Sequence, residues 1–228
     1  MRRAEGNDAE IALALEGVGW AQLLGGNDRA ALDTFREFLG AQLAAGDPVM
    51  VNRARVAVAQ VEVALGHLDE ARALSKEIMA FSRGRGDRRN EHFAAHFLAD
   101  CDLIEENYAA ALHRYRDSLA LVWAIGDRLE SSFEVQGSAM SLAGLGRADE
   151  ALRLAGAVEA EWERLGIEPH MGFWDRLLDR YLVSARSAGG AAAEAAWQYG
   201  RATSFEAAVT TVLAGLDDAP AGPEGSPR

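Results

Sequence analysis

The sequence predicts an all-α fold, a solenoid built from stacked antiparallel helix pairs, from three observations. No segment combines period-two alternation with β-branched enrichment, which argues against strands. Asn or Asp follows most of a series of regularly spaced glycines, and such residues can cap a following helix. Those glycines recur every twenty residues, and each could take the left-handed conformation that ends a helix. The series is Gly6, Gly26, Gly46, Gly66, Gly86, Gly126, Gly146 and Gly166, with Glu106 in the one exceptional slot before Arg186 ends the register.

A spacing of twenty residues between turns implies a repeat of two helices and about forty residues. The first helices of the pairs are predicted near 9–24, 48–65, 88–105 and 128–144. The second helices are predicted near 28–45, 68–84, 108–125 and 147–165. Small residues recur where each pair would cross, and they would allow close approach of the two helices. They are Ala31, Ala71, Ala111 and Ala151, with Gly19, Ala59, Ala99 and Ala139 on the facing helices.

Both ends of the chain depart from this register. Residues 1–166 are predicted to form four repeats, 167–216 a degenerate capping unit, and 217–228 a disordered tail. The capping unit would contain helices over 172–187, 191–199 and 204–215. At the other end, Gly6 and Asn7 are predicted to form a turn between repeats. The exposed edge beside that turn would be covered by a second copy of the chain or by a further domain.

Composition excludes several classes of function. A formal net charge of −12 disfavours contact with phosphate backbones, so no direct nucleic-acid binding is expected. No run approaches the ~18 apolar residues of a membrane span, and the first ten residues do not form a signal peptide. The single cysteine, Cys101, excludes an internal disulfide, indicates a core position and suits a reducing compartment. A cytoplasmic location is therefore expected, and the preference for arginine over lysine indicates a high-GC bacterial genome.

Three stretches carry a resemblance to a known family. ALGHLDEARAL, IEENYAAALHRY and LGRADEALRLA each place a turn before an early alanine, and Ile125–Arg128 reads as a linker between repeats. Over residues 6–166 the chain resembles the tetratricopeptide repeat (TPR) in its longer, forty-residue class. The resemblance implies a right-handed α-solenoid that binds other molecules without catalysing a reaction.

A second, shorter resemblance lies near the C-terminus. Its residues are Ala195, Ala196, Trp197, Gly200, Arg201, Ser204 and Glu206–Val209. This stretch is similar to the end of the helical-repeat region in large bacterial LuxR-type regulators and related ATPase-containing proteins. It implies an alternative function, as the repeat module of such a regulator.

The resemblance to TPR arrays places candidate binding residues on the first helices, which line the concave face. Spacings of three or four put each set on one helix face. The sets are Leu13, Glu16 and Trp20; Arg53, Val56 and Gln60; Phe93, His96 and Asp100; and Phe133, Gln136 and Met140. Aromatic anchors beside polar groups suit a groove that binds a peptide or protein. Alternatively, the apolar members only pack between repeats.

Three functional hypotheses follow. The first is a scaffold or adaptor that binds a protein or peptide in the concave groove. The second is a sensory module that binds a small effector between helices. A helical enzyme is the least supported, because the acidic pairs lie at predicted turns, where they suit helix starts. His92, His96 and Asp100 share a stripe, but the sequence supplies no third strong ligand, so neither a metal nor a cofactor is expected.

Overall fold

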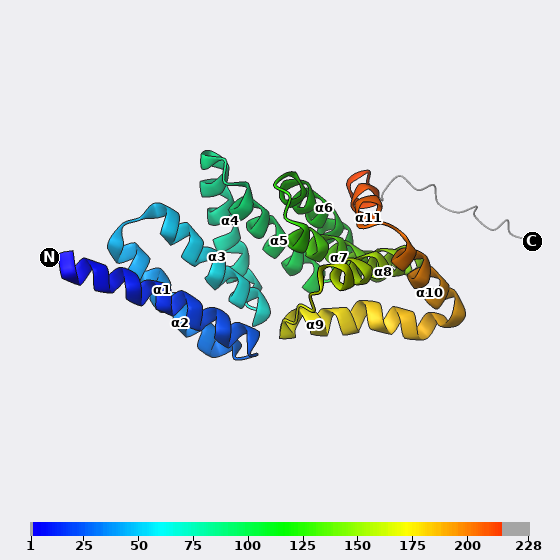
Figure 1. Ribbon diagram of the computed structural model, residues 1–228, viewed down its shortest axis with the longest axis horizontal. Helices are drawn as coiled ribbons and strands as arrows, with labels where there is room; N and C mark the ends of the chain where they lie inside the picture. Colours follow the sequence, from blue (N-terminus) through cyan, green and yellow to red (C-terminus); the bar gives the residue numbers. More distant parts are fainter. Residues whose placement is uncertain (1, 216–228) are drawn as a thin grey trace, which may run out of the picture.

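The structure, a computed structural model, describes residues 2–215, with side chains from Glu10 onward. Within these residues every regular element is helical. The elements are α1 (Arg2–Leu24), α2 (Asp28–Ala45), α3 (Pro48–Ala64), α4 (Leu68–Arg85), α5 (Arg88–Ile104), α6 (Tyr108–Ala124), α7 (Arg128–Gly144), α8 (Ala148–Leu165), α9 (Gly172–Leu178), a π-helical turn η1 (Asp179–Val183), α10 (Ser184–Ala202) and α11 (Phe205–Leu213). From α1 to α8 each helix packs against the next, and the array advances in chain order (Figure 1). The predicted all-α solenoid is confirmed.

The turns within the four pairs have the predicted glycine geometry. Gly26, Gly66 and Gly146 have φ between 76° and 78°. At the first of these turns, the amides of Gly26 and Asn27 donate to the carbonyl oxygens of Leu23 and Gln22, which satisfies the end of α1.

The predicted capping role holds for aspartate at the starts of the later first helices. The carboxylates of Asp47, Asp87 and Asp127 accept backbone N–H bonds at the starts of α3, α5 and α7. Asn27 and Asn107 make no such side-chain bond. Their ψ angles are 56° and 57°, short of the extended backbone that directs a cap side chain at the first turn.

Glu106 adopts the same left-handed conformation as the glycines, with φ of 64°. We expect Glu106→Gly to stabilise the protein by about 0.5–1 kcal/mol, because a left-handed residue with a Cβ is strained by about 1–2 kcal/mol. Loss of the exposed Glu106–Arg180 ion pair offsets part of this gain. Urea unfolding measures the change. The converse change, Gly66→Ala at φ of 76°, should lower the free energy of unfolding. If both substitutions changed the free energy of unfolding in the same direction, this account would be contradicted.

The turn predicted at Gly6 and Asn7 is wrong. α1 continues through both residues from Arg2 to Leu24. Glycine permits a left-handed turn but does not impose one. At the other turns, the helices on both sides pack against each other, and this packing stabilises the reversal.

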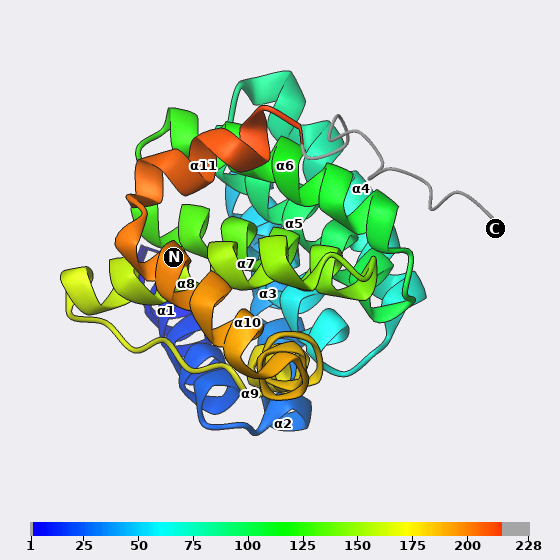
Figure 2. The same cartoon turned by 90° about the vertical axis from the view of Figure 1, so that its right-hand side faces the viewer.

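After α8 the chain forms one further helix pair and a short last helix. α9, η1 and the start of α10 follow one another directly until Gly190, where φ of 55° and ψ of −136° reverse the chain. The rest of α10 packs along α8, and α11 contacts α6, α7 and α8. Figure 2 shows α10 and α11 in front of α7 and α8 at this end of the array.

α8 and α10 cross with their backbones in direct contact. A Cβ on Gly200 would lie 2.0 Å from the carbonyl oxygen of Arg153, and one on Gly156 would lie 2.2 Å from that of Trp197. Around this crossing, the indole of Trp197 donates to Glu159, and the guanidinium of Arg201 pairs with Glu163. Residues 191–213 therefore cover α8.

Candidate functional site

One segment after α8 lies across the first helices of the array. We call Met171–Leu182 the crossing segment. The amide Nε2 of Gln60 in α3 lies 3.4 Å from Sδ of Met171. The indole Nε1 of Trp174 donates to Oε1 of Gln136 in α7 at 2.6 Å. The hydroxyl of Tyr181 donates to the carbonyl of Leu103 in α5 at 3.3 Å. The crossing segment thus contacts α3, α5 and α7.

A cavity of about 250 Å³ lies between the crossing segment and these helices. The four first helices all contribute to its wall. Its lining consists of Trp20, Gln60, Phe93, His96, Phe97, Glu130, Phe133, Met171, Phe173 and Trp174. The cavity is therefore aromatic, with a single carboxylate and a single imidazole in its wall.

The rings of Phe133 and Phe173 meet the indole of Trp174 at steep angles. The ring of Phe133 is inclined by 81° to that of Trp174, with centroids 5.9 Å apart. Phe173 is inclined by 76° to the same indole, at 6.1 Å. Trp174 also lies 5.4 Å from the ring of His96. Rings from the crossing segment, α5 and α7 therefore bound the space from several directions.

The imidazole of His96 lies between two buried carboxylates. Its Nδ1 is 2.7 Å from Oε1 of Glu134, and its Nε2 is 3.4 Å from Oδ2 of Asp100. Burial opposes protonation of His96, but the charges of Asp100 and Glu134 outweigh it and raise the pKa of His96 to about 10. His96 is therefore a cation at neutral pH.

Asp100 responds to the same surroundings in a different way. Burial raises the pKa of its carboxyl to about 6, although the charge of His96 and a 2.6 Å hydrogen bond from Tyr115 favour the ionised form. Burial, together with the adjacent Asp100, raises the pKa of Tyr115 well above its ordinary value. The tyrosine hydroxyl therefore stays a hydrogen-bond donor to the carboxylate.

Glu130 supplies the carboxylate in the cavity wall. Burial favours its neutral form, but hydrogen bonding to His92 and the charges of His92 and His96 lower the pKa of Glu130. The carboxylate lies 3.6 Å from Nε2 of His92, whose Nδ1 bonds Oγ of Ser118 at 2.8 Å. In residues 10–215, no group of three or more His, Cys, Asp or Glu side chains is arranged to hold a metal ion.

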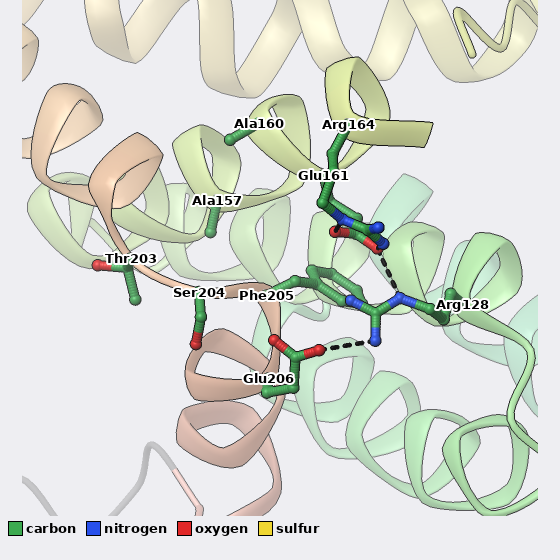
Figure 3. A pocket seen from close by; sticks show the side chains of 9 residues that line it. All are labelled: Arg128, Ala157, Ala160, Glu161, Arg164, Thr203, Ser204, Phe205 and Glu206. Carbon is green, nitrogen blue, oxygen red and sulfur yellow. Dashed lines mark hydrogen bonds and ion pairs between the residues drawn. The ribbon is translucent and has the colours of Figure 1, made fainter. Parts of the chain in front are cut away.

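A second pocket, of about 520 Å³, lies between α7, α8 and α11. Figure 3 shows Arg128 between Glu161 and Glu206, with bonds of 2.6 Å and 2.7 Å. Arg164 pairs with Glu161 as well, at 2.6 Å, and its hydrogen bond is the main reason why the pKa of Glu161 falls to about 2. Two arginines balance two glutamates here, so this pocket has no charge preference that would select an ion.

The comparisons with known proteins concern the fold alone. No protein-family model matches the chain, and no curated protein matches its sequence. Two similar solved structures are of a putative kinesin light chain from Podosopora anserina with nearly identical TPR-like repeats. The first has a TM-score of 0.55 at 16% identity, covering 83% of this chain and 92% of that chain. The second has a TM-score of 0.53 at 14% identity, covering 90% and 96%. The chain therefore has a TPR-like helical-repeat fold. The similarity of residues 195–209 to LuxR-type regulators stays a prediction.

The TPR-like array brings together five of the residues predicted to line its groove. Trp20, Gln60, Phe93, His96 and Phe133 all line the cavity. They come from α1, α3, α5 and α7, as expected for first helices that share one face.

The other predicted residues divide into two groups. Leu13 is 66% exposed on α1, and Arg53 is exposed while its Nε bonds the carboxylate of Glu16 at 2.6 Å. Buried side chains form the second group: Glu16, Val56, Asp100, Gln136 and Met140. The crossing segment explains the position of Gln136, which Trp174 covers. The buried side chains do not present a surface to a partner in this conformation.

Sequence reasoning did not place Phe97, Glu130, Met171, Phe173 and Trp174 at the site. The cluster of aromatic residues at 173–181 was the available signal, and it was interpreted as the cap of the last repeat. This cluster contacts Gln136 and Leu103, which lie 38 and 78 residues earlier in the chain. Across residues 2–215, no helix combines the length and the apolar character needed to cross a lipid bilayer.

Proposed function

We propose that this chain is a protein-interaction scaffold that binds a peptide or protein along the first helices of its array. The observation that carries the proposal is the aromatic surface shared by α1, α5 and α7, where Trp20, Phe93 and Phe133 lie around one space. Aromatic anchors beside a few polar groups are the usual core of a binding surface. The similar TPR-like structures support this class of function. In this proposal the protein acts in the cytoplasm as an adaptor and catalyses no reaction.

Paired substitutions test the groove. We expect Trp20→Ala with Arg53→Ala to weaken capture of protein partners at least about tenfold, because interface aromatics and arginines contribute most to affinity. Partners captured by the wild-type chain are identified first, and their affinities are then measured for each variant.

The matched control removes another aromatic and arginine pair. Arg153 lies 4.8 Å over the ring of Tyr199, away from the cavity. Tyr199→Ala with Arg153→Ala should leave partner affinity unchanged. Because Arg53 also neutralises the buried carboxylate of Glu16, thermal unfolding of both double variants is measured in parallel. Full retention of binding by a folded Trp20 and Arg53 variant would overturn the groove assignment.

A sensory module for a small effector is the second candidate function. The cavity of about 250 Å³, bounded by the crossing segment, favours it. This candidate includes the regulator module suggested by the C-terminal resemblance. An effector bound only by the folded chain would raise the melting temperature by mass action.

We also propose that the edge of the array at α1 binds a second copy of the chain. Large apolar side chains are exposed there, namely Ile11, Leu13, Val18 and Leu24. Burying them against a symmetry mate would remove apolar area from water. Light scattering at increasing concentration should show dimers, and a strict monomer at high concentration would contradict the proposal.

A further inference from the structure

No arginine or lysine lies over the aromatic rings of the cavity within the described structure, and the one cation in its wall, His96, is paired with Glu134 and Asp100. Elsewhere, arginines cover several of the large rings. Arg186 and Arg201 lie 3.4 Å and 4.9 Å from the ring of Trp197. Arg128 covers Trp123 and Phe205, while Arg85, Arg153 and Arg180 cover Phe81, Tyr199 and Tyr181. Among residues 10–215, no arginine contact of this kind involves Trp20, Phe93, Phe133 or Trp174, so none of these rings is already paired with a guanidinium.

The ionisable groups at the cavity leave a negative charge. Three carboxylates, those of Glu130, Glu134 and Asp100, face two imidazoles, those of His92 and His96. The carboxylates here outnumber the imidazoles by one. Arg89, whose charge also acts on Glu130, is itself paired with Asp127 at 2.6 Å. The positive charge of His96 is neutralised by Glu134 at 2.7 Å. Glu130 is the one carboxylate among the residues that line the cavity, so it is the group that an incoming cation would meet.

The size of the space restricts the ligand. A water molecule occupies about 30 Å³ of liquid volume, so about 250 Å³ holds a small organic molecule. Met171 and Trp174 lie across the helices and bond Gln60 and Gln136. The space therefore has the size of a small free molecule.

We propose that the cavity binds a small organic ammonium cation, with its alkylated nitrogen among the aromatic rings and near the Glu130 carboxylate. Alkylated ammonium groups suit such a site because they are weakly hydrated and spread their charge over apolar methyl groups, which contact ring faces. An inorganic cation would require several oxygen ligands, which this aromatic wall lacks. The proposal goes beyond the scaffold function and needs no protein partner.

Calorimetric titration of the full chain with choline tests the proposal. Dimethylbutanol, the uncharged carbon isostere of choline, is titrated in parallel. We expect choline to bind at least about tenfold more tightly than the isostere, because only the cation gains from the ring faces and from Glu130. Quenching of tryptophan fluorescence provides a second readout, since Trp20 and Trp174 line the space.

Three variants locate the site. Glu130→Gln removes the charge at constant shape, and Phe133→Leu removes a ring while the position stays apolar; each should weaken choline binding about tenfold. Glu206→Gln removes a paired carboxylate from the second pocket and should leave choline binding unchanged. Thermal unfolding shows that each variant is folded.

Four results would overturn the proposal. They are equal affinity for choline and dimethylbutanol, absence of choline binding by the folded wild-type chain, choline binding that survives both cavity substitutions, and binding of a trimethyllysine peptide in preference to choline. The last result would place the ammonium group on a protein partner. Because choline binding and partner capture are measured separately, failure of this proposal is distinguishable from failure of the scaffold function.

Discussion

Replacing His96 with glutamine should lower the free energy of unfolding by about 3–5 kcal/mol, the usual cost of removing one member of a buried ion pair. His96 is the cation between Glu134 and Asp100, and both carboxylates are fully buried. Oε2 of Glu134 has no hydrogen-bond partner within the described structure. Without the imidazolium, the two negative charges would face each other in a medium of low polarity. Urea unfolding at pH 7 measures the loss.

The pH dependence of the stability of the same variant tests whether His96 carries a positive charge in the folded protein. The pKa of His96 is about 10 in the folded chain and 6.5 without the fold. A raised pKa contributes stability that is fully present below pH 6.5 and is lost as the pH rises toward 10. The stability difference between wild type and His96→Gln should therefore shrink over this range. Asp100 has a pKa of about 6 against an ordinary 3.8, so its own contribution changes below this window.

His113 provides the matched control. It pairs only with Asp117 in the same helix, and both side chains are more than half exposed. His113→Gln should change the free energy of unfolding by less than about 0.5 kcal/mol. Two results would contradict a charged His96 between two carboxylates. One is a similar loss of stability in both histidine variants. The other is a stability difference between wild type and His96→Gln that stays constant from pH 6.5 to 10.

Gly200→Ala should destabilise the protein by about 3 kcal/mol, at the upper end for overpacking, because the new methyl would meet rigid backbone. The Cβ would lie 2.0 Å from the carbonyl oxygen and 2.8 Å from the carbonyl carbon of Arg153. α10 would have to move away from α8, and the contacts of Trp197 and Arg201 with α8 would weaken. Thermal and urea unfolding measure the cost.

Gly40 is the matched control for this change. It lies inside α2, and a Cβ there would meet no atom within 4 Å. Gly40→Ala should stabilise by about 0.5–1 kcal/mol, because alanine has the higher helix propensity. A neutral effect of Gly200→Ala would show that α10 does not cross α8 at this distance.

Much of the fold could be predicted because turn chemistry is local. A glycine with positive φ and an aspartate cap act within a few residues. The spacing of Gly26, Gly66 and Gly146 therefore predicted the helix ends to within a few residues. Glu106 adopts the left-handed conformation of the glycines because α5 and α6, on either side of it, pack against each other as the other pairs do. Gly6 does not, because a glycine permits a left-handed turn without imposing one, and α1 continues through it.

The candidate site was predictable only in part. Periodicity within each first helix indicated which face Trp20, Phe93 and Phe133 share. It carried no information on the partners that later residues provide, so Asp100 and Gln136 were expected at the surface and are buried. The indole of Trp174 reaches Gln136 through folding of a segment that belongs to no repeat. Such a contact depends on the whole array.

The crossing segment has a consequence for how the molecule unfolds. In a simple stack each repeat touches only its neighbours, and the ends can open while the middle stays intact. Here Met171 contacts Gln60, and Tyr181 contacts Leu103, over separations of 111 and 78 residues. Opening either pair at the middle of the stack would also break these long-range contacts. We therefore expect the crossing segment to couple the melting of the second and third pairs to that of the helices after α8.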